Sequence, residues 1–148
     1  MENNIDFGGF IQVAIIVEDI EKAAQKWAQL FNVPVPEIRL LPAGEDKGLR
    51  YRGEPANYAL KLAVIQANGW IVELHEPDEN PSTFREFLNK HGNGVHHLGF
   101  CVGEKRDGVI AELEQMGYAM RTVGSNNSWT IVDSEDDLGV NLNIKPKP

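Results

Sequence analysis

The feature that most constrains the fold is that one order of elements occurs twice along the chain. An apolar, β-branched run at 10–17 predicts a buried strand, and Asp19 can cap a helix that extends to about Phe31. Three strand-like runs follow, at 38–41, 58–66 and 70–77. The same order, a strand, a helix and three strands, then returns in the second half. Such self-similarity indicates an internal duplication.

The second half begins after a short helix that Ser82 caps and the sequence HGNG ends. A strand is predicted at 95–102 and a helix at 105–116, which Gly117 closes. Three further strand candidates follow, at 118–123, 128–134 and 139–146. The sequence therefore predicts one domain, 1–148, made of two modules at about 10–77 and 94–146, joined by a helical linker at 78–93.

Composition excludes several classes of function. The formal net charge is −8 and the sequence pI about 4.9, which argues against nucleic acid or an anionic membrane as partner. Lys61, Arg50 and Arg52 form a positive cluster that we interpret as solvated surface. The single cysteine, Cys101, excludes a disulfide framework. No apolar run approaches the ~20 residues of a membrane span and residues 1–9 do not resemble a signal peptide, so we expect a cytoplasmic protein.

Overlaying the two halves singles out four polar residues in apolar strands. Gln12 and the residues to Val17 lie over His97 and the residues to Val102, and Glu73 lies over Asn143. Because strand side chains alternate between faces, the small residues Ala14 and Gly99 share a face with Gln12 and His97 and leave room above it.

A buried polar side chain is unfavourable unless it has a partner, so we expect Gln12, Glu73, His97 and Asn143 to gather in one cleft. Each alone has an ordinary structural interpretation, as a core histidine or an outward strand residue. The joint pattern favours a functional site, with His and Glu as metal ligands and the two amide oxygens as weaker ones.

The remaining histidines receive weaker predictions. His75 shares the face of Glu73, His96 points to the opposite face from His97 and is predicted to be structural, and His91 ends the linker helix. Aromatic and apolar candidates for the lining of a pocket are Trp70, Trp129, Tyr58, Phe100 and Met120.

The segments VAIIVEDIEKA, VELHEP, FLNKHGNGVHHLGFCV and DDLGVNLNI resemble the vicinal oxygen chelate superfamily, and most of all methylmalonyl-CoA epimerase and related racemases. The resemblance implies an α+β fold in which two paired βαβββ modules form a cupped, mostly antiparallel sheet around a central cleft. It also implies a divalent metal ion (Co, Mn, Ni or Zn), with ligands at Gln12, Glu73, His97 and Asn143.

Two of these positions depart from the family pattern, which usually has His in the first strand and Glu in the last. Asn143 cannot move a proton as that Glu does, because an amide does not titrate. A second acidic residue of the epimerase falls near Asn57, with Glu54 close by. The usual pair of proton-transferring carboxylates is therefore expected to be absent or rebuilt.

The resemblance implies an isomerase, a racemase or epimerase that moves a proton at a carbon alpha to a carbonyl. Its small-molecule substrate would be an acyl-CoA or an enolisable ketone such as a dihydroisoflavone. Glu73 and His97 would be the catalytic groups. The relatives also suggest a homodimer. Two alternatives stay open: a non-catalytic binding protein for a drug or small aromatic, and a glyoxalase-like lyase. A dioxygenase is least favoured, because its iron site needs two His and a carboxylate and only His97 and Glu73 fit.

Overall fold

The fold was established from a computed structural model that describes residues 3, 5–42 and 48–148. Part of the segment 1–9 used above lies outside the described residues. Within the part of the chain that is described, no helix has the length and apolar character needed to cross a membrane.

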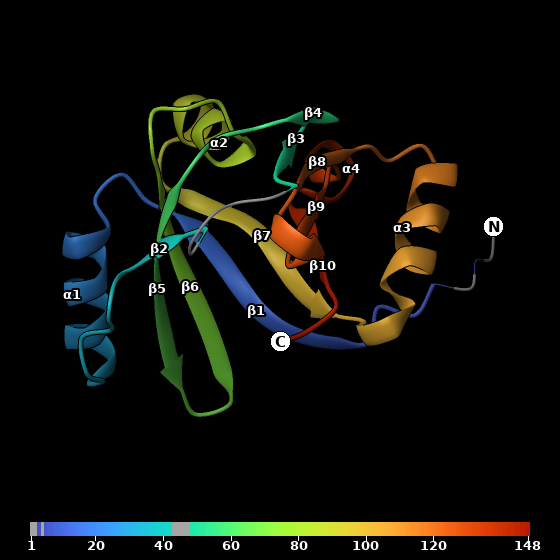
Figure 1. Cartoon of the computed structure of the whole chain (residues 1–148). Helices are drawn as coiled ribbons and strands as arrows, with labels where there is room; N and C mark the ends of the chain where they lie inside the picture. The colour runs from blue at the N-terminus through green and yellow to red at the C-terminus, as the bar shows by residue number, and fades with distance from the viewer. Residues whose placement is uncertain (1–2, 4, 43–47) are drawn as a thin grey trace.

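One curled sheet carries the fold, with helices at its outer flanks and within its curl (Figure 1). The strands are β1 Gly9–Ile16, β2 Arg39–Leu41, β3 Arg50–Tyr51, β4 Glu54–Pro55, β5 Leu60–Ala67, β6 Trp70–Pro77, β7 Gly94–Cys101, β8 Met120–Val123, β9 Thr130–Val132 and β10 Asn141–Lys145. The α-helices are α1 Ile20–Phe31, α2 Thr83–His91, α3 Arg106–Gln115 and α4 Glu135–Leu138, and the short 3-10 turns are η1 Gly103–Lys105 and η2 Ser125–Asn127.

The strand order is nearly symmetric about the contact between β1 and β7. It runs β2-β5-β6-β1-β7-β10-β9-β8-β3-β4, so each half contributes its first strand to the centre and places its last strand beside it. β1 pairs in parallel with β6, β7 pairs in parallel with β10, and the other pairings are antiparallel. The predicted α+β fold with a cupped, mostly antiparallel sheet is confirmed, whereas the module boundaries at 10–77 and 94–146 stay a prediction.

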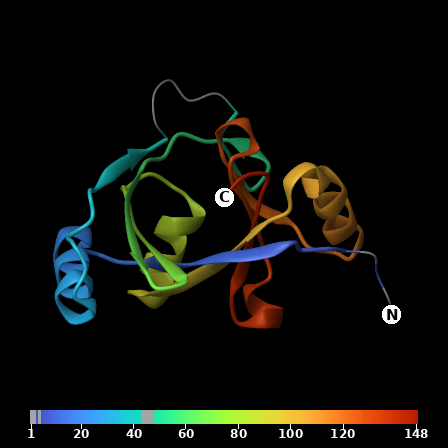
Figure 2. The same ribbon diagram turned by 90° about the horizontal axis from the view of Figure 1, so that it is seen from below.

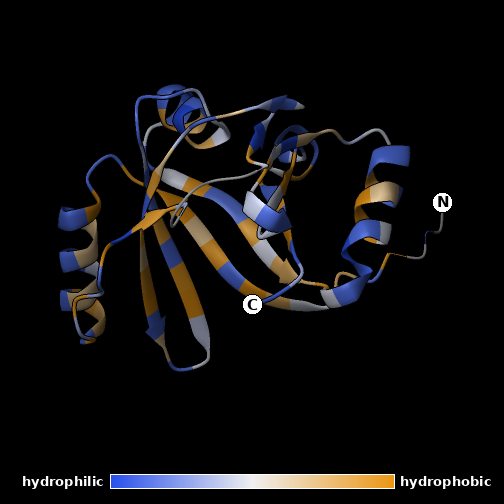
Figure 3. Ribbon diagram, in the orientation of Figure 1, coloured by the Kyte–Doolittle hydropathy of each residue, from blue (hydrophilic) through white to orange (hydrophobic). Residues whose placement is uncertain are grey.

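The convex face of the sheet is covered by two helices, one for each half. α1 packs on β5 and β6 through a cluster that includes Ile20, Ala24 and Leu74, and α3 packs on β9 and β10 through one that includes Leu113 and Ile144. Figure 2 shows both helices outside the curl, and Figure 3 shows alternating apolar and polar bands along β1, β5 and β6. This alternation leaves the opposite side chains facing the concave side.

The concave side has its own core at the end where α2 lies. Phe84 and Phe87 of α2 pack there with Ile16, Tyr58 and Ile131, residues that come from both halves of the chain. The linker helix therefore fills one end of the curl, and the rest of the concave face is left for a cavity.

The elements that the sequence did not predict are short. β3 and β4 form a hairpin across Arg52 and Gly53, which both have positive φ angles of 51° and 82°. Two central residues with φ > 0 are typical of a type I′ turn, but Arg is not its usual sequence signal. α4 is a single turn that ends at Gly139, and β9 is shorter than the strand predicted at 128–134.

The positive cluster lies on the surface, as predicted. Lys61 pairs with Glu21 and Glu76 at 3.5 and 3.4 Å, and Arg52 pairs with Glu86 at 2.6 Å. Their neighbouring carboxylates leave little net positive charge to attract an anion there.

Both predicted helix caps are present. Asp19 accepts a hydrogen bond from the backbone N–H of Lys22 at 3.1 Å, and the buried Ser82 hydroxyl accepts one from Arg85 at 2.9 Å. We expect Ser82→Ala to lower the free energy of unfolding by about 1 kcal/mol because the first turn of α2 loses its acceptor. Urea denaturation followed by circular dichroism would measure this.

Ser82→Gly is the matched control for this prediction, since glycine at a cap costs only a few tenths of a kcal/mol. If the glycine variant were the less stable of the two, packing of the Ser82 side chain would outweigh its capping role.

Candidate functional site

A cavity of about 280 Å³ opens on the concave face of the sheet, and all four predicted site residues line it. Its polar part consists of Gln12, Glu73, His97 and Asn143 together with His75. Its walls are apolar, and the wall residues are Leu41, Leu60, Leu62, Val64, Ile71, Phe84, Trp129 and Ile131. The remaining lining residues are Arg39, Ser128, Lys145 and Pro148.

Strand register at the centre of the sheet brings the four residues together. Ala14 of β1 pairs with Glu73 of β6 on one side and with His97 of β7 on the other. Gly99 pairs in the same way with Gln12 of β1 and Asn143 of β10. Ala14 therefore stands between Glu73 and His97, and Gly99 stands between Gln12 and Asn143.

Gly99 is required at its position by the side chain of Gln12. A Cβ atom built on Gly99 would lie 2.6 Å from Cγ of Gln12, a distance that real contacts do not reach. A side chain at Gly99 would therefore displace that of Gln12, whose amide donates to Glu73.

The carboxylate of Glu73 is held by two hydrogen bonds. Gln12 Nε2 donates to Glu73 Oε2 at 2.8 Å, and His75 Nε2 lies 3.3 Å from the same oxygen. Burial raises the pKa of Glu73, but the hydrogen bond and charge of His75, with Lys145 and His97 nearby, offset this and leave that pKa below its usual value. Glu73 is therefore ionised at neutral pH.

His97 is buried and neutral. Burial is the main cause that holds the pKa of His97 well below 6.5, and the neighbouring His96 and His75 act in the same direction, while Glu73 opposes them. Its Nδ1 lies 2.9 Å from Nδ1 of His96, and its Nε2 lies 3.5 Å from Nδ2 of Asn143. A neutral imidazole has one nitrogen that donates and one that accepts.

The two amides present nitrogen, not oxygen, to their neighbours in the site. The oxygen of Asn143 accepts from the backbone N–H of Thr130 at 3.1 Å, so its NH₂ faces His97. The NH₂ of Gln12 faces Glu73, since a carboxylate only accepts. An amide NH₂ does not bind a metal ion, so these contacts favour a donor role for both residues, and their assignment as metal ligands stays a prediction.

A three-residue group fits a divalent ion better than the predicted set of four. Glu73, His75 and His97 each offer a ligand atom, and these atoms lie within 4.8 Å of one another. A carboxylate with two imidazoles suits Mn, Fe, Co, Ni or Zn. His75 also has a buried Nδ1 without a hydrogen-bond partner among the described residues. The predicted ligand set contained one histidine, His97. The second is His75, which the sequence indicated only as a weaker candidate for the cleft.

Several residues predicted near the site lie elsewhere. Of the five apolar and aromatic candidates only Trp129 lines the cavity. Trp70 packs against Trp27, Phe100 packs against Phe7, and Tyr58 lies in the concave core. Strand alternation turns Trp70 and Phe100 away from the cavity, and Tyr58 precedes β5 and packs in the concave core outside the cavity lining.

Neither Asn57 nor Glu54 is among the described residues that line the cavity, and within that set Glu73 is the only acidic residue. A second carboxylate for proton transfer is therefore not found among them.

Two cations that the sequence did not single out also line the cavity, Arg39 of β2 and Lys145 of β10. Lys145 follows Asn143 by two residues, so strand alternation was a signal that could have found it. No such periodic signal marked Arg39.

Comparisons with known proteins agree with this architecture. A methylmalonyl-CoA epimerase from Mycobacterium tuberculosis is similar at a TM-score of 0.59 and 20% identity over 95% of this chain and 89% of that chain. A hypothetical protein from Bacillus halodurans C-125 has a TM-score of 0.59 and 19% identity over 95% and 94% of the two chains. These likenesses show the fold, and no curated protein gives a significant match.

The family assignment comes from the sequence over most of its length. The model of the glyoxalase/bleomycin resistance protein/dioxygenase superfamily matches residues 11–131, which include Gln12 of β1, Glu73 of β6 and His97 of β7. Since this match spans well over half of the chain, the protein belongs to the glyoxalase/bleomycin resistance protein/dioxygenase superfamily.

Proposed function

We propose that the protein is an isomerase that racemises or epimerises a carbon alpha to a carbonyl. The observation that carries the proposal is one ionised carboxylate, Glu73, held beside N–H donors in a cavity with apolar walls. Structural neighbours that are methylmalonyl-CoA epimerases support the same reaction class.

Glu73 is the group proposed to take the proton. Its hydrogen bonds from Gln12 and His75 fix the carboxylate, and removing the proton turns the substrate carbonyl into an enolate. Donors are then needed at the enolate oxygen. The Asn143 NH₂ and the Lys145 ammonium group line the same cavity and supply them.

The spacing of the two proposed acid–base groups favours a single base. Bases on opposite faces of a carbon, each about 3 to 3.5 Å from it, stand about 6 Å or more apart. Ligand atoms of Glu73 and His97 lie within 4.8 Å of each other, which is too close for these two atoms to stand on opposite faces of one carbon. Racemisation then requires that the enolate turn over in the cavity, so that the proton returns to its opposite face. His97 assists this proton transfer.

The cavity limits the part of a substrate that is enclosed. At about 280 Å³ it holds an acyl group or one aryl ketone, and a larger remainder such as coenzyme A would extend outside it. The proposed substrate is therefore an acyl thioester or an enolisable ketone such as a dihydroisoflavone. The cytoplasmic location and the homodimer stay predictions.

A metal ion is compatible with this proposal. A divalent ion held by Glu73, His75 and His97 would, when bound, act as a Lewis acid on the substrate carbonyl.

Exchange of the alpha proton with solvent tests the reaction class. We expect optically pure methylmalonyl-CoA or dihydrodaidzein, incubated with the protein in deuterated buffer, to take up deuterium and lose optical activity, as followed by mass spectrometry and polarimetry. Tight binding of a compound that stays unlabelled and optically pure would instead support a binding protein of the same fold.

Glu73→Gln tests the base. We expect it to lower the exchange rate about 10²- to 10⁴-fold, because the amide cannot accept the proton. Glu79→Gln is the matched control, since the Glu79 side chain is 94% exposed and outside the cavity. An exchange rate unaffected by Glu73→Gln would remove Glu73 from the proposed mechanism.

Metal titration tests the three-residue group. We expect protein stripped with a chelator to bind Mn²⁺ or Co²⁺ at one site in isothermal titration calorimetry. His75→Ala should weaken that binding at least about tenfold, whereas Asn143→Ala should retain it because its NH₂ faces the site. Loss of binding in Asn143→Ala with binding retained in His75→Ala would favour the four-residue set, and no binding by the unaltered protein would exclude the metal from this proposal.

A further inference from the structure

His96 is completely buried but does not line the cavity. It precedes His97 on β7 at a β-bulge in the pairing with β1, and its ring packs on Phe84 and Phe87 of the concave core. The prediction that it points to the opposite face from His97 is therefore wrong, and the two rings meet through their Nδ1 atoms at 2.9 Å. Two imidazole nitrogens at this distance make a hydrogen bond only if one carries a proton and the other does not.

The direction of that hydrogen bond follows from Asn143. A backbone N–H can only donate, so the bond from Thr130 N–H at 3.1 Å fixes the Asn143 oxygen, and the NH₂ group must face His97 Nε2 at 3.5 Å. A protonated Nε2 would place donor against donor. The proton of the neutral His97 ring therefore belongs on Nδ1, where it is donated to His96.

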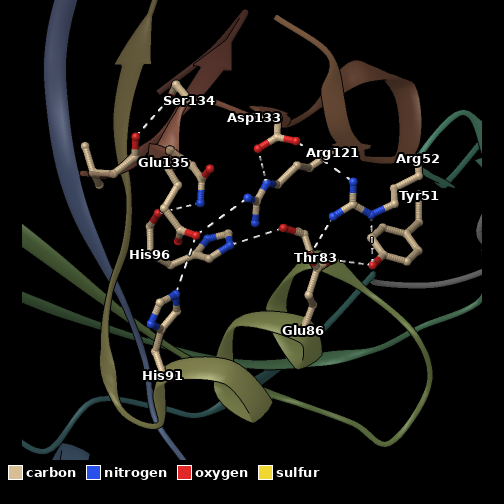
Figure 4. A network of polar contacts seen from close by, with 12 residues as sticks. Tyr51, Arg52, Thr83, Glu86, His91, His96, Arg121, Asp133, Ser134 and Glu135 are labelled. Carbon is tan, nitrogen blue, oxygen red and sulfur yellow. Dashed lines mark hydrogen bonds and ion pairs between the residues drawn. The ribbon is translucent and has the colours of Figure 1, made fainter. Parts of the chain in front are cut away.

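The other ring nitrogen of His96, Nε2, has a partner that agrees with this direction of hydrogen bonding. Since its Nδ1 accepts, the single proton of the neutral His96 ring is on Nε2, which lies 3.3 Å from Oγ1 of Thr83 in helix α2 (Figure 4). Every donor in the chain then faces an acceptor.

We propose that His96 is a positioning residue that holds His97 in the tautomer with its proton on Nδ1, so that the Nε2 lone pair is directed to the Asn143 side of the cavity. In this state Nε2 can accept a proton or bind a cation, and in the other tautomer it could do neither. The linker helix α2 takes part through Thr83. The consequence for catalysis rests on the proposed function, but the tautomer itself does not.

Nuclear magnetic resonance of the histidine rings measures the tautomer directly. The chain has 4 histidines, so multiple-bond ¹H–¹⁵N spectra at pH 7 can be assigned with one variant for each. We expect His97 to show a protonated Nδ1 and an unprotonated Nε2, and His96 to show the opposite pattern. A protonated Nε2 on His97 in the unaltered protein would overturn the proposal without any variant of His96.

Two substitutions of His96 separate positioning from packing. His96→Asn keeps an oxygen close to the place of Nδ1, so His97 should keep its proton on Nδ1. His96→Leu has similar bulk but no acceptor, so the proton of His97 should move to Nε2. A folded His96→Leu variant with unchanged His97 signals would contradict the proposed role.

Activity gives the second readout. With a substrate that exchanges, His96→Leu should lower the exchange rate about 10- to 100-fold, and His96→Asn should restore most of it. If His97 shows the expected tautomer but the protein exchanges no substrate, the isomerase proposal is rejected and the proposed role of His96 is retained. If His97 shows the opposite tautomer but the protein does exchange its substrate, only the proposed role of His96 is rejected.

Discussion

The antiparallel pairing of β1 with β7 is the interaction on which the rest of the structure depends. It joins the first strands of the two halves, and because each of these strands pairs in parallel with the last strand of its own half, four strands become neighbours at the centre. Their inward side chains meet over Ala14 and Gly99, the two small residues of the central strands. A polar cluster can be buried there because its members satisfy one another.

The chemistry of the cluster differs from a set of four metal ligands. Gln12 and Asn143 present N–H groups, Glu73 is ionised and His97 is neutral. Such a site offers one base and several donors, which suits the formation and stabilisation of an enolate. His75 adds a second imidazole two residues after Glu73. The cluster therefore contains two histidines and one carboxylate, although Gln12 in the first strand and Asn143 in the last are amides.

The linker helix has a structural and a chemical connection to this cluster. Phe84 packs at the end of the cavity and Thr83 contacts His96, whose ring in turn contacts His97. The end of α2 also contacts the second half, where His91 lies 3.5 Å from Glu135 of α4 (Figure 4). The segment that joins the two halves in sequence is thus also the one that supports the imidazole chain behind the cavity.

The sequence by itself determined the repeated order of elements, the helix caps and the residues that face the concave side. These follow from periodicity and local hydrogen bonds, which act between neighbours in the chain. It could also bring Gln12, Glu73, His97 and Asn143 together, because the two halves overlay. The short β3–β4 hairpin was missed since Arg52 is not a usual residue for its turn.

Only the tertiary structure decided which way the amides point, which histidine joins Glu73 and how the two bases are spaced. The Asn143 amide is oriented by Thr130, and the ring of His97 by contact with His96 and Asn143. Trp70, Tyr58 and Phe100 were placed in core clusters instead of the cavity. Side-chain orientation depends on contacts between strands that are far apart in sequence, and no local pattern records those contacts.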